Sequence, residues 1–281
     1  MLSRSVFAAV GTVLSVALGG MDCAGAAPIS LAQVKAFAEA EVRIEWLRRR
    51  KTVDWAAIRS DYEQTLAIVN AVDAREQTRY AAELAEALDK CEAGTAPKVN
   101  QQVLAKGLQH VAVLGIKHEL DAALTAPAPG RRKGVACVAA FVEGISPTFS
   151  RRDADYFGGK KILERAADDA VAQLQAAAGE GGIALSAARR VLEDVIARTY
   201  ALSVLYEVSE IEKYRDTDPA KCAVKLKEAQ IFYRIIGPRI QRRSPALDTK
   251  ILAILNAAYR NMSVADLERL LRAGLPGIHL K

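Results

Sequence analysis

Val103–Leu120 reads VLAKGLQHVAVLGIKHEL and predicts a long, largely apolar helix. Alanine and leucine dominate the apolar residues of the chain, and aromatic residues make up only 6% of it. Both features favour helices, because alanine and leucine have high helix propensity and strand-forming residues are sparse. A second stretch, VLEDVIARTYALSVLYEV at Val191–Val208, matches the first at an offset of 88 residues and places Glu207 opposite Glu119. The match suggests that one helical unit occurs twice.

Apolar residues recur at helical spacing along almost the whole sequence, and no stretch alternates like a strand for more than a few residues. Glycine and proline interrupt this pattern between the expected helices. We therefore predict an all-α helical bundle. The expected helices cover about 30–51, a segment capped by Asp54, 74–92, 98–125, 132–146, 154–178, 185–215, 219–237, 247–259 and 264–273.

A second internal sequence match supports the repeat. FVEGISPTFSRRD at Phe141–Asp153 resembles FYRIIGPRIQRRS at Phe232–Ser244 at an offset of 91 residues. A looser match, at an offset of 101, joins the segments that start at Asp54 and Asp155. Because the three matches keep their order, we predict an internal duplication of a four-helix unit. The units would be 54–150 and 151–250, flanked by an N-terminal helix at 27–53 and C-terminal helices and tail at 251–281.

The segments Phe141–Asp153 and Phe232–Ser244 each contain a proline followed by two arginines. We expect Pro147 and Pro238 to end their helices, because proline lacks a backbone donor and forces the preceding residue out of helical geometry. Arginines just beyond would stabilise the carbonyl-rich end of each helix. Binding of an anion is the alternative role for these arginines.

Residues 1–26 resemble a secretory signal peptide, with a basic start, an apolar run at 6–20 and small residues at 24–26. Cleavage near Ala26 would send the protein to the periplasm or outside the cell. No later segment is apolar for long enough to span a bilayer, so we expect no transmembrane segment in the mature chain. The net charge is +6 with both signs interleaved, and no basic strip carries aromatic residues, so nucleic acid is not an expected partner.

An exported chain keeps its cysteines in an oxidising compartment. After cleavage three remain, at spacings that fit no zinc, haem or redox motif. Cys137 has the surroundings of a buried apolar residue. Cys91 and Cys222 fall near expected helix ends, so they are the better candidates for a disulfide.

His118 and Glu119 fall opposite Tyr206 and Glu207 when the two long helices are matched. Glu210 follows Glu207 at a helical spacing and adds a carboxylate to the same face. If the units face each other, these five residues could share a cleft and bind a transition metal ion such as iron, because imidazole, phenolate and carboxylate suit such ions. The alternative is that neighbouring groups satisfy the histidine and that Lys117 or an arginine neutralises the carboxylates.

The sequence contains no G-x-S-x-G motif and no glycine-rich phosphate loop, so we do not expect an enzyme. The function that we expect is an exported, periplasmic binding protein with a metal ion or a small ligand between its two units. The alternative is a non-catalytic envelope scaffold, or interaction module, with another envelope protein as its partner.

Overall fold

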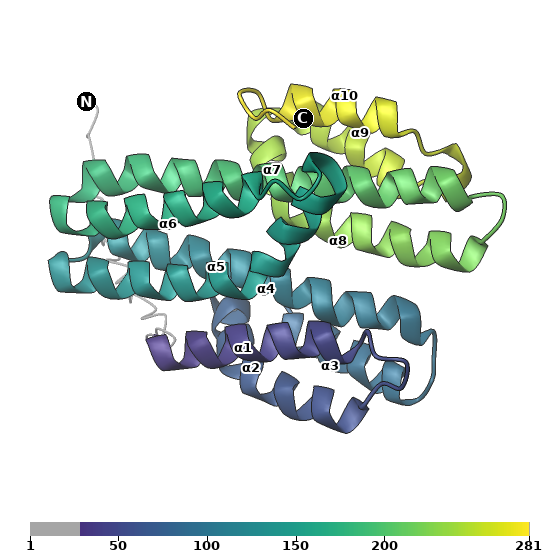
Figure 1. Cartoon of the computed structure of the whole chain (residues 1–281), viewed down its shortest axis with the longest axis horizontal. Coiled ribbons are helices and arrows are strands. Elements are labelled where there is room, and N and C mark those ends of the chain that lie inside the picture. The colour runs from purple at the N-terminus through teal and green to yellow at the C-terminus, as the bar shows by residue number, and fades with distance from the viewer. Residues whose placement is uncertain (1–28, 281) are drawn as a thin grey trace, which may run out of the picture.

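The computed structural model describes residues 29–280. Within this range the chain forms ten α-helices, one short 3-10 helix and no strand, which confirms the all-α prediction (Figure 1). In chain order they are α1 (Leu31–Leu47), α2 (Trp55–Glu76), α3 (Tyr80–Glu92), α4 (Pro97–Thr125), α5 (Ala128–Phe157), α6 (Ile162–Glu180), α7 (Gly182–Tyr214), α8 (Pro219–Arg243), α9 (Pro245–Leu255), η1 (Tyr259–Asn261) and α10 (Val264–Gly274).

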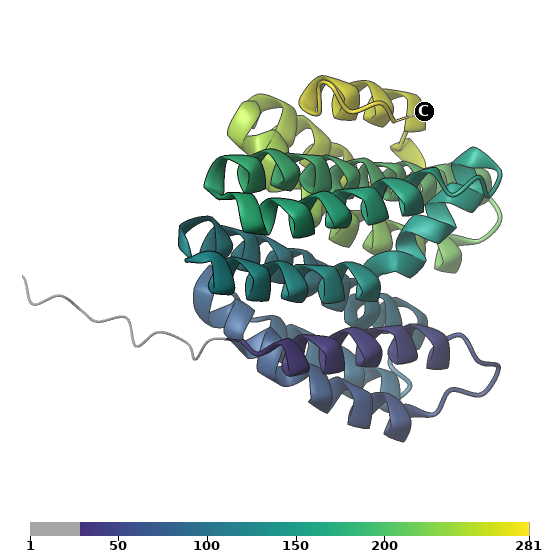
Figure 2. The same ribbon diagram turned by 60° about the vertical axis from the view of Figure 1, so that its left-hand side comes forward.

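The helices are stacked in the order of the sequence, as Figures 1 and 2 show from two directions. Helices α1 to α3 lie at one end of the molecule and α9 and α10 at the other, with the long helices α4, α5, α7 and α8 between them. Besides its sequence neighbours, α4 packs against α8, and α1 packs against α5. Segments from the two halves of the chain therefore meet along α4 and α8.

Side-chain caps fix several helix starts where the sequence places them. The Ser30 hydroxyl accepts a hydrogen bond from the Gln33 backbone N–H, and the Gln33 side chain accepts one from the Ser30 backbone, which completes a capping box. Asp54 accepts from the Ala57 backbone N–H and begins α2 in the same way. These caps confirm the predicted starts of the first two helices.

One continuous hydrophobic cluster contains residues from all ten α-helices. Helices α4 and α7 cross the middle of it and bury residues on most of their sides, including polar ones. At the edge of the molecule, two apolar side chains of α1 are only partly covered. Val42 is 40% exposed and Trp46 is 55% exposed, with the Arg50 guanidinium 3.7 Å from the centre of the Trp46 ring.

The prediction that proline ends two helices is wrong. Helix α5 continues for ten residues beyond Pro147 to Phe157, and α8 continues for five beyond Pro238 to Arg243. A proline inside a helix removes one backbone hydrogen bond and crowds one carbonyl, but it does not prevent the helix from continuing. Buried residues follow each proline, including Phe149 in α5 and Ile240 in α8, and their packing offsets that local cost.

The predicted signal peptide lies outside the described residues. None of the described helices is both long enough and apolar enough to cross a membrane.

Candidate functional site

His118 lies on the side of α4 that faces α2. Its Nε2 is 2.6 Å from the Glu76 Oε1, and the Lys117 Nζ is 2.9 Å from the same oxygen. Burial lowers the pKa of His118, although the carboxylate of Glu76 opposes that effect. Glu119 is buried as well, and burial raises its pKa while the nearby charges of Arg75 and Lys133 lower it.

Tyr206, Glu207 and Glu210 lie on α7 and belong to a different network. The Glu207 carboxylate accepts a hydrogen bond of 2.7 Å from Lys225 on α8, which also donates one of 2.9 Å to Glu228. The Tyr206 ring lies 4.2 Å from the Arg152 guanidinium. Glu210 pairs with Lys221 at 3.2 Å. Lysine and arginine therefore already neutralise this face of α7.

The five predicted metal ligands do not come together. No group of three or more His, Cys, Asp and Glu side chains within residues 29–280 is arranged to hold a metal ion. The reason is the rotation of the two helices about their axes, since His118 faces α2 whereas Glu207 faces α8 and the Arg152 side chain of α5. Matched positions in the sequence thus point to different neighbours.

The disulfide expected between Cys91 and Cys222 is not formed in the structure. Both are buried free thiols, as is Cys137. Cys91 donates to the Pro97 carbonyl oxygen at 3.6 Å and Cys222 to the Ile211 carbonyl oxygen at 3.8 Å, so each is held within its own local turn or helix pair. Burial raises the pKa of Cys91 and of Cys137 to about 11.

A buried ionic cluster that was not predicted from the sequence lies where α1, α4 and α5 meet. Glu45 accepts hydrogen bonds from Arg48 and from Arg151, at 2.8 Å for the latter, and lies 3.4 Å from the Lys106 Nζ. Lys106 is only 1% exposed. Burial lowers the pKa of Lys106 to about 8, against the opposing effect of Glu45. Its ion pairs join α1, α4 and α5, which indicates a structural role in holding the three helices together.

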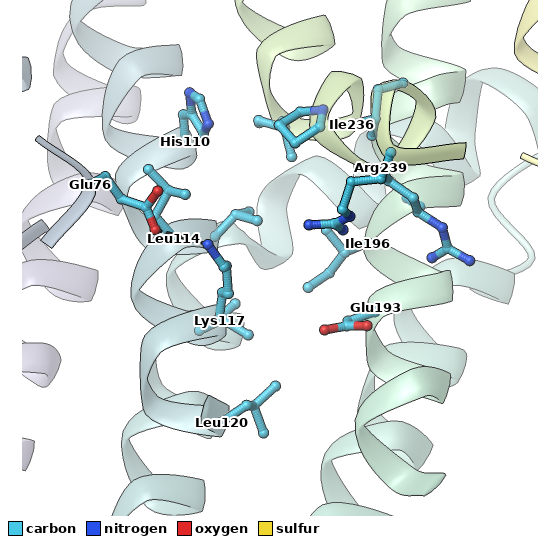
Figure 3. Close-up of a pocket in the computed structure, with 15 residues that line it drawn as sticks. Glu76, His110, Leu114, Lys117, Leu120, Glu193, Ile196, Ile236 and Arg239 are labelled. Carbon is cyan, nitrogen blue, oxygen red and sulfur yellow. Dashed lines mark hydrogen bonds and ion pairs between the residues drawn. The ribbon is translucent and has the colours of Figure 1, made fainter. Parts of the chain in front are cut away.

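A cleft lies between α4 on one side and α7 and α8 on the other (Figure 3). Its volume is about 170 Å³. Figure 3 shows Leu114, Lys117 and Leu120 on one wall, and Ile196 and Arg239 on the other. The remaining lining residues are Glu76, His110, Val113, Ile116, Glu193, Ala197, Ile235, Ile236, Pro238 and Arg242. Aliphatic side chains form most of the surface, with charged groups among them.

Proline and histidine shape two parts of this cleft. Pro238, which lies inside α8, presents its ring to the cleft at a point where a backbone N–H is absent. His110 lies between this cleft and a groove beside α3, with its Nδ1 2.8 Å from the Tyr80 Oη. Burial lowers the pKa of His110 to about 4, so the ring is neutral at physiological pH and its hydrogen bond to Tyr80 holds it in place.

The residues that line the two walls of the cleft recur at helical spacing in the sequence, but this spacing alone does not show that the two sets face each other. His110, Leu114 and Lys117 follow one another at helical spacing on α4, and Ile235, Arg239 and Arg242 do so on α8. Each stripe ends in a cation, yet only the packing of the three helices shows that both stripes face the same space.

No protein-family model, no curated protein sequence and no solved structure matches this chain.

Proposed function

We propose that the protein is an exported, non-catalytic binding protein that takes a small amphiphilic ligand in the cleft between α4, α7 and α8. The observation that supports the proposal is the cleft itself, an aliphatic surface that carries charged groups from both walls. Ligand sites of proteins commonly combine these two properties. The basic and apolar pattern of residues 1–26 supports export.

The repeat in the sequence agrees with this location. If 54–150 and 151–250 are duplicated units, α4 belongs to the first, and α7 and α8 belong to the second. A cleft between them would then lie between the units, where a binding site is easily made from two similar surfaces. We do not propose a metal ion as the ligand, because the side chains predicted to bind it pair with other residues in two separate networks.

A scaffold is the second candidate, and one observation favours it. Val42 and Trp46 are exposed on the same side of α1, at a spacing of one helical turn, so they offer an apolar patch to another protein. The patch is small, and it does not use the cleft.

A matched pair of variants tests the proposal. Leu114→Trp adds bulk to a side chain that lines the cleft, whereas Ile183→Trp changes a residue that is 92% exposed and lies outside it. Small amphiphilic compounds with anionic, neutral and cationic head groups would be screened by thermal unfolding. A ligand present at ten times its Kd stabilises the protein by about 1.4 kcal/mol, which raises the Tm by about 3–5 °C.

We expect at least one compound to stabilise the wild-type protein and the Ile183→Trp variant but not the Leu114→Trp variant. The proposal fails if no compound stabilises the protein, or if every stabilising compound acts equally on both variants.

A further inference from the structure

The size and charge of the cleft indicate which class of ligand it binds, an inference that rests on the proposed function. Its volume of about 170 Å³ is close to that of engineered apolar cavities of about 150 Å³ that bind benzene. The apolar part of the ligand should therefore be about the size of one aromatic ring or a short branched chain. Longer acyl chains would not be contained.

The charges that line the cleft leave a cation without a partner. The Glu76 Oε1 lies 2.9 Å from the Lys117 Nζ, and the Glu193 Oε1 lies 2.7 Å from the Arg189 Nε. On the same wall as Glu193, Arg239 contacts Asp194 at 2.5 Å. Both carboxylates of the lining thus already contact a cation.

Arg242 differs from these groups, because it has no ion pair within residues 29–280 while its side chain lines the cleft. It lies in the last turn of α8, as does its neighbour Arg243, which does not line the cleft. The negative end of the helix dipole stabilises both arginines to a similar degree, so it does not account for the position of Arg242 beside the apolar surface.

We infer that the ligand is a small carboxylate whose head group pairs with Arg242 and whose single apolar group lies among Leu114, Leu120 and Ile196. An arginine guanidinium can bind a carboxylate through two parallel hydrogen bonds, and this geometry favours arginine over lysine for such ligands.

Three probes with the same phenyl group separate the head group from the apolar part. They are phenylacetate, 2-phenylethanol and 2-phenylethylamine, and their binding would be measured by calorimetry on the mature protein. We expect phenylacetate to bind about tenfold more tightly than the alcohol, because its contact with Arg242 is charge-assisted, and the amine to bind least. Added salt should weaken only the binding of the acid.

Arg242→Gln and Arg243→Gln are matched variants in the same helical turn. We expect Arg242→Gln to reduce the affinity for phenylacetate to that for 2-phenylethanol, without changing the affinity for the alcohol, and Arg243→Gln to change neither. Equal effects of the two variants on phenylacetate would overturn the assignment of Arg242. If the alcohol or the amine bound as tightly as the acid, the inference that the ligand is a carboxylate would be wrong.

The two proposals fail in different ways. If none of the three probes binds while another compound binds in a manner that Leu114→Trp abolishes, the carboxylate inference is wrong and the proposed function stands. If no compound is sensitive to Leu114→Trp, both are wrong.

Discussion

Glu45 should be among the most important side chains for the stability of this protein, and Glu45→Gln tests that role. The residue is 8% exposed and pairs with the buried Lys106, which is 1% exposed, as well as with Arg48, Arg49 and Arg151. Burial alone would raise the pKa of Glu45. The opposing charges of Lys106 and the three arginines hold it well below its ordinary value.

The expected loss follows from the exposure of each partner. Removing one member of a buried ion pair costs about 3–5 kcal/mol, because the remaining charge is left unpaired away from water. Lys106 and Arg48, whose side chains are 1% and 7% exposed, would be the charges left without Glu45. Arg49 and Arg151 are 50% and 29% exposed in their side chains, so water can replace their contacts and the loss of these two pairs adds little to that cost. We therefore expect Glu45→Gln to lower the free energy of unfolding by about 3–5 kcal/mol.

Urea unfolding followed by circular dichroism measures this loss. With a slope of about 3 kcal/mol per M, the midpoint should fall by about 1–1.7 M. Glu39→Gln is the matched control on the same helix, because Glu39 is 71% exposed and lies 4.0 Å from Arg43, and it should cost less than about 0.5 kcal/mol.

The double variant Glu45→Gln with Lys106→Met also removes the buried lysine charge and should recover the part of the loss that comes from leaving Lys106 unpaired. A cost for Glu45→Gln no larger than that of Glu39→Gln, or a double variant no more stable than the single one, would refute the reasoning.

Three further predictions concern pH, packing and thiols. Burial first, and then the charge of Glu45, raise the pKa of Glu41 to about 8, so its contribution to stability is complete below pH 4.5 and is lost as the pH rises through 8. Glu41→Gln cannot ionise and should remove about 4 kcal/mol of the stability difference between pH 5 and pH 9, and an unchanged pH profile of the Tm would contradict this. Gly115→Ala would place a Cβ 2.5 Å from the Phe141 ring and should destabilise the protein by about 1–3 kcal/mol. The Cβ of Gly179→Ala meets nothing within 4 Å, so this variant should stabilise the protein by about 0.5–1 kcal/mol. Chemical denaturation measures both changes, and changes of the same sign would be evidence against the packing described. For a protein that begins at residue 27, Ellman's reagent in 6 M guanidinium without reductant should detect three thiols, those of Cys91, Cys137 and Cys222, and a single thiol would contradict the free thiols of the structure.

Features that depend on neighbouring residues could be predicted from the sequence. Ser30 and Asp54 begin helices because their side chains accept hydrogen bonds from backbone groups three residues ahead, which is a local property. The effect of Pro238 could not be predicted, because the helix continues past it through packing that involves distant residues. The exposure of Trp46 in α1 could not be predicted either, because it depends on which helices pack beside α1.

The candidate site could not be predicted from the sequence, for a related reason. Periodicity gives the residues that share one face of a helix, but it does not say which neighbour that face meets. His118 and Glu207 occupy matched positions and yet contact α2 and α8, respectively. The cleft needs residues such as Leu114 and Arg242, which lie 128 positions apart in the chain and meet only because α4 packs against α8.

Methyl NMR spectra recorded during a ligand titration would test the central claim, binding in this cleft, most directly. The titrant would be whichever of phenylacetate and 2-phenylethanol binds more tightly. The methyl resonances of Leu114, Leu120 and Ile196 should shift in proportion to occupancy, whereas those of Ile251 in α9 and Leu271 in α10, which are buried and do not line the cleft, should stay in place. Unchanged resonances of the cleft residues at a saturating concentration, or larger shifts in α9 and α10, would contradict the account.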